Sequence, residues 1–160
     1  MTKKKRTTNR YHYIECGLDN IYLLNGFRIV PGPRGKTVHV QNLEGLHKAI
    51  GMMLVSEKKH IDGREFRFLR HELNMTQQNL AALLGVNVQA IARWEKEKTE
   101  DIPGPAQRVI RLLYSEKMNG NQAICVPLER LAELDERVAD EPEIDFQQDT
   151  YEGWQPALAA

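Results

Sequence analysis

The fold is decided by residues 76–98, TQQNLAALLGVNVQAIARWEKEK, in which one helical pattern is interrupted by LGVN and then resumes. Leu80, Leu83 and Leu84 fall on one face at helical spacing, so the first part predicts an amphipathic helix. Gly85 can adopt the left-handed conformation that ends such a helix. The stretch therefore predicts two short helices joined by a tight turn.

Each of these two helices has a side chain that can cap its first turn. Thr76 can accept a hydrogen bond from an orphan backbone N–H of the first helix, and Asn87 can do the same for the second. We expect the second helix to span residues 87–97, with Ile91 and Trp94 on its apolar side. Its opposite side carries Gln89, Ala92, Arg93 and Lys96.

The polar side of the second helix carries residue types that recognise DNA bases. In the major groove, Gln can form two hydrogen bonds with adenine and Arg can form two with guanine. A helix that packs by one stripe and presents these side chains on the other is suited to reading a DNA sequence. The alternative without a binding role is a helical hairpin whose polar faces are only solvated.

The same stretch resembles the helix-turn-helix of lambda-type repressors, the Xre family. The matching segments are TQQNLAALLGV and IARWE, and EFRFLRHELNM looks like the first helix of that family. The resemblance implies a DNA-binding transcriptional regulator, and we expect a repressor. The family usually has glycine where this chain has Glu97, so either the second helix runs on through Lys98 or the turn there is strained.

Individual residues can be assigned to the expected contacts with double-stranded DNA. Gln89 and Arg93 would read bases, and Val88 is available to touch a thymine methyl group. Phosphate contacts would come from Gln77, Asn87 and Lys96. Two weaker phosphate candidates, which could equally be solvated surface charges, are Arg70 and Lys98.

Length and composition suit a protein of the cytoplasm. A chain of 160 residues accommodates one or two small domains, and neither half is apolar enough for a membrane span. Met1–Arg10 is basic but lacks the apolar core of a signal peptide, so nothing argues for export. Cys16 and Cys125 are too few for a disulfide framework, which is consistent with a reducing compartment.

The net charge of zero is an average over three unlike regions. Residues 1–10 hold five basic and no acidic residues, and we expect a disordered basic arm there. Residues 11–126 hold 15 basic and 12 acidic residues, whereas residues 127–160 hold 2 basic and 10 acidic ones. Because phosphate attraction depends on the local face, overall neutrality does not exclude nucleic acid.

The first half of the chain predicts a small α+β domain over residues 11–60. Short strands are expected at residues 11–14, 21–30 and 36–41, separated by GLDN, by NG within the second run, and by PGPRG. Asn42 can cap a helix that extends to about Glu57. The apolar side of this helix would consist of Leu43, Leu46, Ile50, Met53 and Leu54.

The second half predicts an all-α domain over residues 61–120. Asp62 and Glu65 form a capping box for its first helix. The core side of that helix would consist of Phe66, Leu69 and Leu73. A later helix over residues 105–117 would turn inward Val109, Ile110, Leu112 and Leu113.

Residues 121–160 predict one further short helix and an acidic tail. The helix would span residues 127–138, with apolar residues at Leu128, Leu131, Leu134 and Val138. From Asp140 the chain is acidic and we expect disorder, although Tyr151 and Trp154 could anchor it on something.

The region YHYIECGLDNIYLLNGF followed by NLEGLHKAI looks like the N-terminal part of MqsA-type antitoxins, and the resemblance extends over residues 11–117. In that family two pairs of cysteines hold zinc. Here only Cys16 remains, and PGPRG stands where a cysteine knuckle is expected. The nearby candidates His12, His39 and His47 lack knuckle spacing, so we expect no metal and no other cofactor.

Two functions follow as alternatives. The first is a sequence-specific regulator that binds a palindromic operator as a homodimer, because one helix-turn-helix reads few base pairs. The second is an antitoxin that binds a toxin through residues 11–60 and regulates its own operon. An enzyme is not expected, because no nucleophile and base, paired carboxylates or phosphate loop can be assembled.

Overall fold

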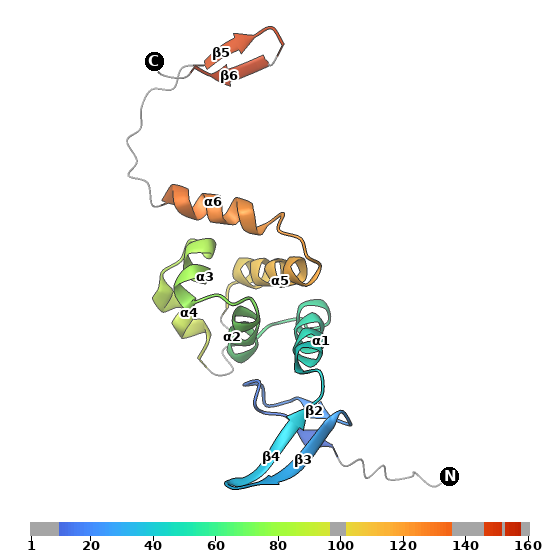
Figure 1. Cartoon of the computed structure of the whole chain (residues 1–160). Coiled ribbons are helices and arrows are strands. Elements are labelled where there is room, and N and C mark those ends of the chain that lie inside the picture. Colours follow the sequence, from blue (N-terminus) through green and yellow to red (C-terminus); the bar gives the residue numbers. More distant parts are fainter. Residues whose placement is uncertain (1–9, 97–101, 136–145, 152, 158–160) are drawn as a thin grey trace, which may run out of the picture.

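The computed structural model describes residues 10–96, 102–135, 146–151 and 153–157 (Figure 1). The expected basic arm over residues 1–10 therefore lies almost wholly outside the described residues. Helices and short antiparallel strand pairs make up the described part, so the α+β fold class is confirmed. The elements in chain order are β1 (Tyr11–His12), β2 (Tyr22–Leu23), β3 (Phe27–Gly32), β4 (Gly35–Val40), α1 (Leu43–Ser56), α2 (Gly63–Glu72), α3 (Gln77–Leu84), α4 (Val88–Trp94), α5 (Gly104–Met118), α6 (Cys125–Asp135), β5 (Phe146–Asp149) and β6 (Gly153–Pro156).

The N-terminal strands form two separate ladders. β1 pairs with β2, and β3 pairs with β4 from Phe27 opposite Val40 to Gly32 opposite Gly35. The break predicted at NG within residues 21–30 is confirmed, because the run divides into β2 and β3 on either side of Gly26, whose φ of 76° is left-handed. The connection PGPRG is shorter than expected, since β3 extends through Gly32 and β4 begins at Gly35.

Helix α1 begins and ends where the sequence predicted. The Asn42 side chain accepts a hydrogen bond from the Gly45 N–H at 3.1 Å, and the Glu57 N–H closes the helix on the Met53 carbonyl. Its apolar side is narrower than expected. Ile50 and Leu54 are buried, whereas Leu43 and Met53 are exposed because nothing among the described residues covers that edge of the helix.

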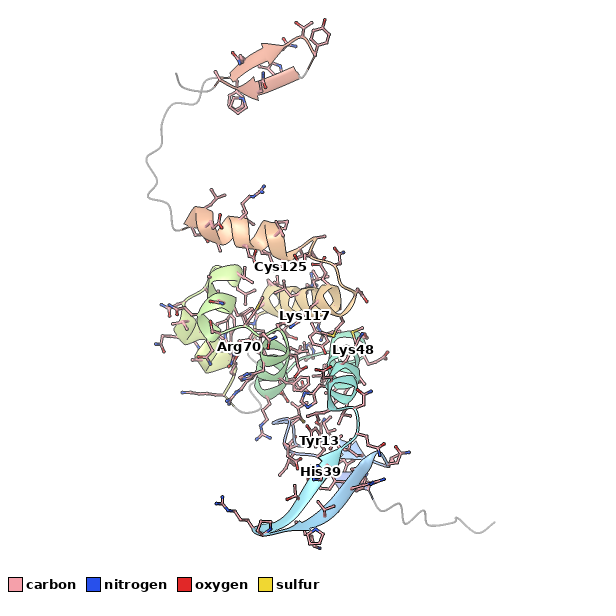
Figure 2. The ribbon with its side chains drawn as sticks, in the orientation of Figure 1. Tyr13, His39, Lys48, Arg70, Lys117 and Cys125 are labelled. Carbon is pink, nitrogen blue, oxygen red and sulfur yellow. The ribbon has the colours of Figure 1, made fainter. Side chains whose placement is uncertain are left out.

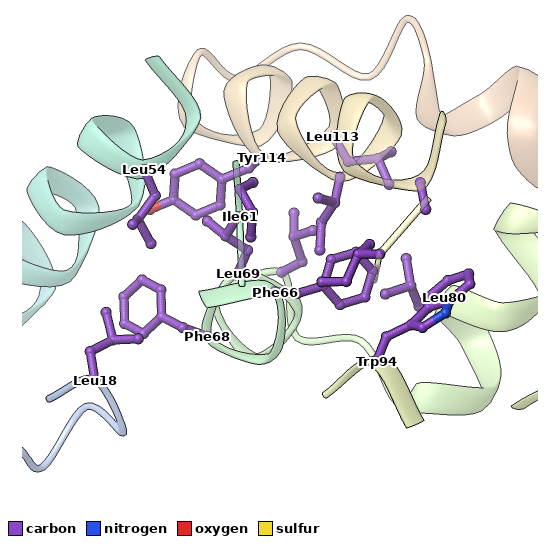
Figure 3. Close-up of a cluster of buried hydrophobic side chains, with 14 of the residues drawn as sticks. Leu18, Leu54, Ile61, Phe66, Phe68, Leu69, Leu80, Trp94, Leu113 and Tyr114 are labelled. Carbon is purple, nitrogen blue, oxygen red and sulfur yellow. The ribbon is translucent and has the colours of Figure 1, made fainter. Parts of the chain in front are cut away.

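Helix α2 lies between the two halves of one continuous hydrophobic core. The predicted capping box is confirmed, with Asp62 and Glu65 each accepting from the other's backbone. Phe66, Leu69 and Leu73 are buried as expected, but Phe68 is also buried and packs towards the N-terminal Leu18 (Figure 3). The boundary expected between residues 60 and 61 is therefore bridged by apolar side chains on both sides of α2.

Helix α5 packs against both α1 and α2 and so connects α1 to the helix-turn-helix half. Tyr114 is fully buried and lies against Gly51, whose missing side chain makes room for the phenol ring. The Arg111 guanidinium donates to the carbonyls of Leu54, Val55 and Lys58, near the end of α1, at 3.0, 2.9 and 2.7 Å. The prediction that Leu112 faces inward is wrong, because it is 48% exposed.

The C-terminal part is more structured than expected. Helix α6 packs on α3, with Leu128 half-buried but Leu131 and Leu134 exposed; Val138 lies outside the described residues. The prediction of disorder from Asp140 is wrong for the described residues 146–151 and 153–157, where β5 and β6 form a hairpin. Aromatic residues favour strands on either side of the turn, and Gly153 supplies a positive φ of 77°. No described helix is long and apolar enough to cross a membrane.

Candidate nucleic-acid interface

Local hydrogen bonds build the two helices at the centre of the candidate site. Thr76 Oγ1 accepts from the Asn79 N–H at 3.0 Å at the start of α3. α3 ends at Gly85, whose φ of 63° is left-handed, and the Val86 N–H returns to the Ala81 carbonyl at 3.0 Å. This is the bonding pattern of a Schellman motif. The predicted helix end is therefore confirmed.

Helix α4 is anchored by one side and exposed on the other. The Asn87 side chain caps it by accepting from the Gln89 N–H at 2.8 Å, as predicted. Ile91 and Trp94 are buried, and the Trp94 ring meets the Phe66 ring edge-on at a centroid distance of 6.1 Å. Of the residues that we expected on the opposite side, Gln89, Arg93 and Lys96 are exposed, whereas Ala92 is half-buried; Val88 is exposed as well.

The end of α4 differs from the prediction. The helix spans Val88–Trp94 rather than residues 87–97, because Asn87 is its cap and the chain turns at Glu95. The Lys96 N–H bonds to the Arg93 carbonyl at 3.3 Å, a tighter spacing than in an α-helix. The alternative in which the helix runs on through Lys98 is therefore wrong, and Glu97 and Lys98 themselves lie outside the described residues.

A buried carboxylate ties three helices together behind the exposed face. Glu95 is 7% exposed and Arg70 of α2 is 6% exposed. Arg70 Nε and Nη2 donate to the two oxygens of Glu95 at 2.6 and 2.9 Å, and Arg70 Nη1 donates to the Met75 carbonyl at 2.7 Å. Gln77 Nε2, at the start of α3, also donates to Glu95 Oε2 at 2.8 Å. Figure 2 shows Arg70 inside the helical body, next to α3 and α4.

This cluster changes how two of the expected contact residues are understood. The interpretation of Arg70 as a phosphate contact or a solvated charge is wrong, because its guanidinium is buried and fully engaged. Gln77 remains a predicted phosphate contact, but its side-chain amide already has a partner in Glu95. Helical spacing gave a signal for Glu95, because that position falls on the same side as Ile91 and Trp94.

The exposed edge of α2 near this cluster carries His71. Its Nε2 lies 3.4 Å from Arg70 Nη2 and accepts from Arg67 Nε at 3.5 Å. Burial, together with the charges of Arg70 and Arg67, lowers the pKa of His71 below its usual value. The lowered pKa favours the neutral ring, whose Nε2 can accept from these guanidinium groups.

Of the candidate metal ligands of the N-terminal region, His12 and His47 have other partners and His39 is exposed on β4. His12 Nε2 lies 2.7 Å from the Asp19 carbonyl oxygen, and His47 bonds to Tyr13 and Glu72 at 2.8 and 2.9 Å. Cys16 is half-buried, and burial raises the pKa of its thiol. Within the described ranges, no group of three or more His, Cys, Asp or Glu side chains is placed to hold a metal ion.

The segment from α2 to the start of α5 contains the two capped helices and the cluster around Glu95. Residues 66–103 match the helix-turn-helix family model. This match supports a DNA-binding segment of the Xre, lambda-repressor type within residues 66–103. Comparisons with curated proteins and with solved structures found no match. The wider resemblance to MqsA-type antitoxins stays a prediction.

Proposed function

We propose that this protein is a transcriptional repressor that reads DNA sequence by placing α4 in the major groove. The supporting observation is the division of α4 into a buried side, with Ile91 and Trp94, and an exposed side, with Gln89 and Arg93. Neither exposed side chain has a hydrogen-bond partner among the described residues. Their donors and acceptors are therefore available to base edges.

The proposed roles separate base contacts from phosphate contacts. Gln89 and Arg93 form bidentate hydrogen bonds with bases, and Val88, 36% exposed, touches a thymine methyl group. Phosphates are contacted near the starts of α3 and α4, where free backbone N–H groups favour an anion. They are also contacted beyond the end of α4, where the chain carries cations. The proposed phosphate contacts are Gln77, Asn87, Lys96 and Lys98.

The repressor acts as a homodimer on a two-fold symmetric operator, because one α4 covers only a few base pairs. Helix α6 presents a suitable surface, since it packs on α3 by one side and leaves Val126, Leu131 and Leu134 exposed by 48%, 57% and 49% on the other. A dimer bound across two half-sites blocks access to the covered DNA, which is the simplest route to repression. Leu131→Glu is expected to produce a monomer in light scattering and weaker operator binding.

The decisive experiment compares affinities for the selected operator and for random duplexes. Arg93→Ala is expected to lose about 1–3 kcal/mol of binding free energy on the operator and much less on random DNA, because it removes base contacts. Gln89→Ala is expected to behave in the same way at another base pair. If both variants leave the operator-to-random ratio unchanged, α4 does not read the major groove.

Phosphate contacts are tested by the salt dependence of the same affinities. Lys96→Ala is expected to weaken binding to all sequences and to reduce the slope of log K against log salt by about one. Lys48→Ala is the matched control, because Lys48 is exposed on α1, away from α4 in the view of Figure 2. The control is expected to leave both affinities unchanged.

A further inference from the structure

The β3–β4 hairpin is basic along its whole length. Between Phe27 and Asn42 the sequence contains Arg28, Arg34 and Lys36 but no Asp or Glu. All three cations are exposed, and none of them has an ion-pair or hydrogen-bond partner in the part of the chain that the structure describes. This differs from the helical body, where Arg64, Arg70 and Arg111 are engaged by carboxylates or carbonyls.

The register of the hairpin gives it two distinct faces. Residues that pair across the strands point to the same side, so Arg28 and His39 share one face. The other face carries the pairs Phe27 with Val40, Ile29 with Val38 and Pro31 with Lys36. Pro33 and Arg34 form the turn between the strands.

Among the described residues, only those at the base of the hairpin pack against the rest of the protein. The Phe27 ring lies 5.3 Å from the Tyr11 ring, and Val40 is half-buried. Further along, Ile29 is 50% exposed and Val30 is 36% exposed although both are apolar. The outer part of the ribbon therefore projects from the body with uncovered apolar and cationic side chains.

The loop between β1 and β2, which precedes the hairpin in the chain, lies near the end of α4. A pocket of about 550 Å³ is lined from one side by Glu15, Cys16 and Gly17, between β1 and β2, and from the other by Glu95 at the end of α4. Arg64 Nη1 of α2 and Asp19 Oδ2 form an ion pair at 3.0 Å that holds the same loop in place. In Figure 1 the turn of the hairpin extends to the lower left, below α4 and away from α5.

We propose that the β3–β4 hairpin is a second DNA-contacting element, which binds the phosphate backbone of the duplex next to the base pairs covered by α4. This inference rests on the proposed function, since it takes its DNA from the duplex that α4 occupies. Duplex DNA presents about one negative charge per 1.7 Å of its axis, so it continues past the end of α4 as an anionic surface. Two-stranded ribbons fit the grooves of DNA, and apolar residues such as Ile29 and Pro31 can pack on sugars.

A duplex fits this hairpin better than an acidic protein surface for two reasons. The first is position, because in Figure 1 the turn of the hairpin extends towards the side of the view on which α4 lies, the helix whose exposed side carries Gln89 and Arg93. The second is the continuation of positive charge along the chain, since residues 1–10 lead into β1 with five basic and no acidic residues. Arg10 itself lies 4.1 Å above the Tyr22 ring of β2.

The test uses the full chain with Arg34→Gln and Lys36→Gln combined. We expect weaker binding to operator and random duplexes by the same factor, about tenfold at moderate salt, and a slope of log K against log salt reduced by about two. The operator-to-random ratio should stay at the wild-type value. The matched control is Lys48→Gln with Lys59→Gln, two exposed cations on α1 and just after it, which should change neither quantity.

Hydroxyl-radical footprinting supplies the second measurement. The hairpin variant is expected to lose backbone protection at the edge of the footprint and to keep protection of the half-site centre.

A wild-type slope and a wild-type footprint in this variant, with Arg93→Ala still altering the operator-to-random ratio, would overturn the inference alone and direct attention to a protein partner for the hairpin. A reduced slope with no effect of Arg93→Ala would keep the hairpin contact and remove α4 as the reading helix. Failure of the wild-type chain to bind any duplex would overturn both. Thermal unfolding of each variant confirms that the loss is not one of folding.

Discussion

Helix α4 and the β3–β4 hairpin both present cations to solvent, but they are held in different ways. α4 is fixed along its inner side by Ile91, Trp94 and the buried Glu95. The hairpin is fixed only at its base, where Phe27 meets Tyr11. Reading bases requires side chains held to within a fraction of an ångström, whereas phosphate attraction tolerates looser placement. We therefore propose that the packed element supplies sequence specificity and the projecting one general affinity for DNA.

The largest expected effect is a loss of stability at the inner side of α4. Trp94→Ala removes a side chain that is 6% exposed and leaves a cavity beside Phe66, so the free energy of unfolding should fall by about 3–5 kcal/mol. Ile29→Ala on the hairpin, at a position 50% exposed, should change it by less than about 1 kcal/mol. Urea denaturation of both variants checks this contrast. Equal losses would mean that the hairpin is as firmly packed as α4.

The next effect concerns the buried ion pair behind α4. Glu95→Gln leaves the Arg70 guanidinium buried without a counter-charge, and we expect a loss of about 3 kcal/mol in the free energy of unfolding. Arg64→Gln is the matched control, because the pair that it breaks with Asp19 is exposed and should contribute less than about 1 kcal/mol. Similar losses in the two variants would show that Glu95 is not held as a buried charge.

A glycine tests whether α1 belongs to the same packed body as α4. A Cβ at Gly51 would lie 2.1 Å from the Tyr114 hydroxyl oxygen, so Gly51→Ala should lower the free energy of unfolding by about 1–3 kcal/mol. Ordinary helix propensity predicts the opposite sign for this change. Gly104→Ala, at the start of α5 with no atom within 4 Å of its Cβ position, is the control and should be neutral or slightly stabilising. A stabilising Gly51→Ala would mean that α1 moves independently of α5.

The helix-turn-helix could be predicted from sequence because its determinants are local. Thr76, Gly85 and Asn87 act within a few residues of themselves, and each was assigned the role that the structure shows. The helical spacing of polar and apolar residues likewise placed Gln89 and Arg93 on the exposed side of α4. The contacts with DNA that we assign to these residues stay predictions.

What could not be predicted depends on segments that meet only in the folded chain. Arg70 and Glu95 are 25 residues apart, so the local sequence around either residue does not predict that they form an ion pair. Phe68 is buried because the N-terminal loop with Leu18 and the His47 ring of α1 lie against that side of α2. In the C-terminal region the acidic composition outweighed a weaker signal, namely the aromatic residues and Gly153 that form the β5–β6 hairpin. The errors at Arg70 and Phe68 followed from judging a residue by its sequence neighbours instead of its spatial ones, whereas the β5–β6 hairpin was missed although its signal is local.

The smallest expected effect is a pH dependence that distinguishes α2 from the hairpin. Burial and the neighbouring Arg70 and Arg67 lower the pKa of His71 in the folded state below its ordinary value of 6.5, so the unfolded chain binds a proton more readily. The contribution of this group to stability is therefore full at pH values above 6.5 and falls as the pH drops through that value towards the lowered pKa. Urea denaturation at about pH 7.5, 6.5 and 5.5 should show that His71→Gln loses less stability on acidification than the wild type, because glutamine keeps an acceptor but does not titrate. His39→Gln, an exposed change on β4, is the control and should keep the wild-type pH dependence. If the two variants give the same pH dependence, the guanidinium groups of α2 do not act on His71. The contrast between cations that have partners in the helical body and cations without partners on the hairpin would then be weaker than the structure indicates.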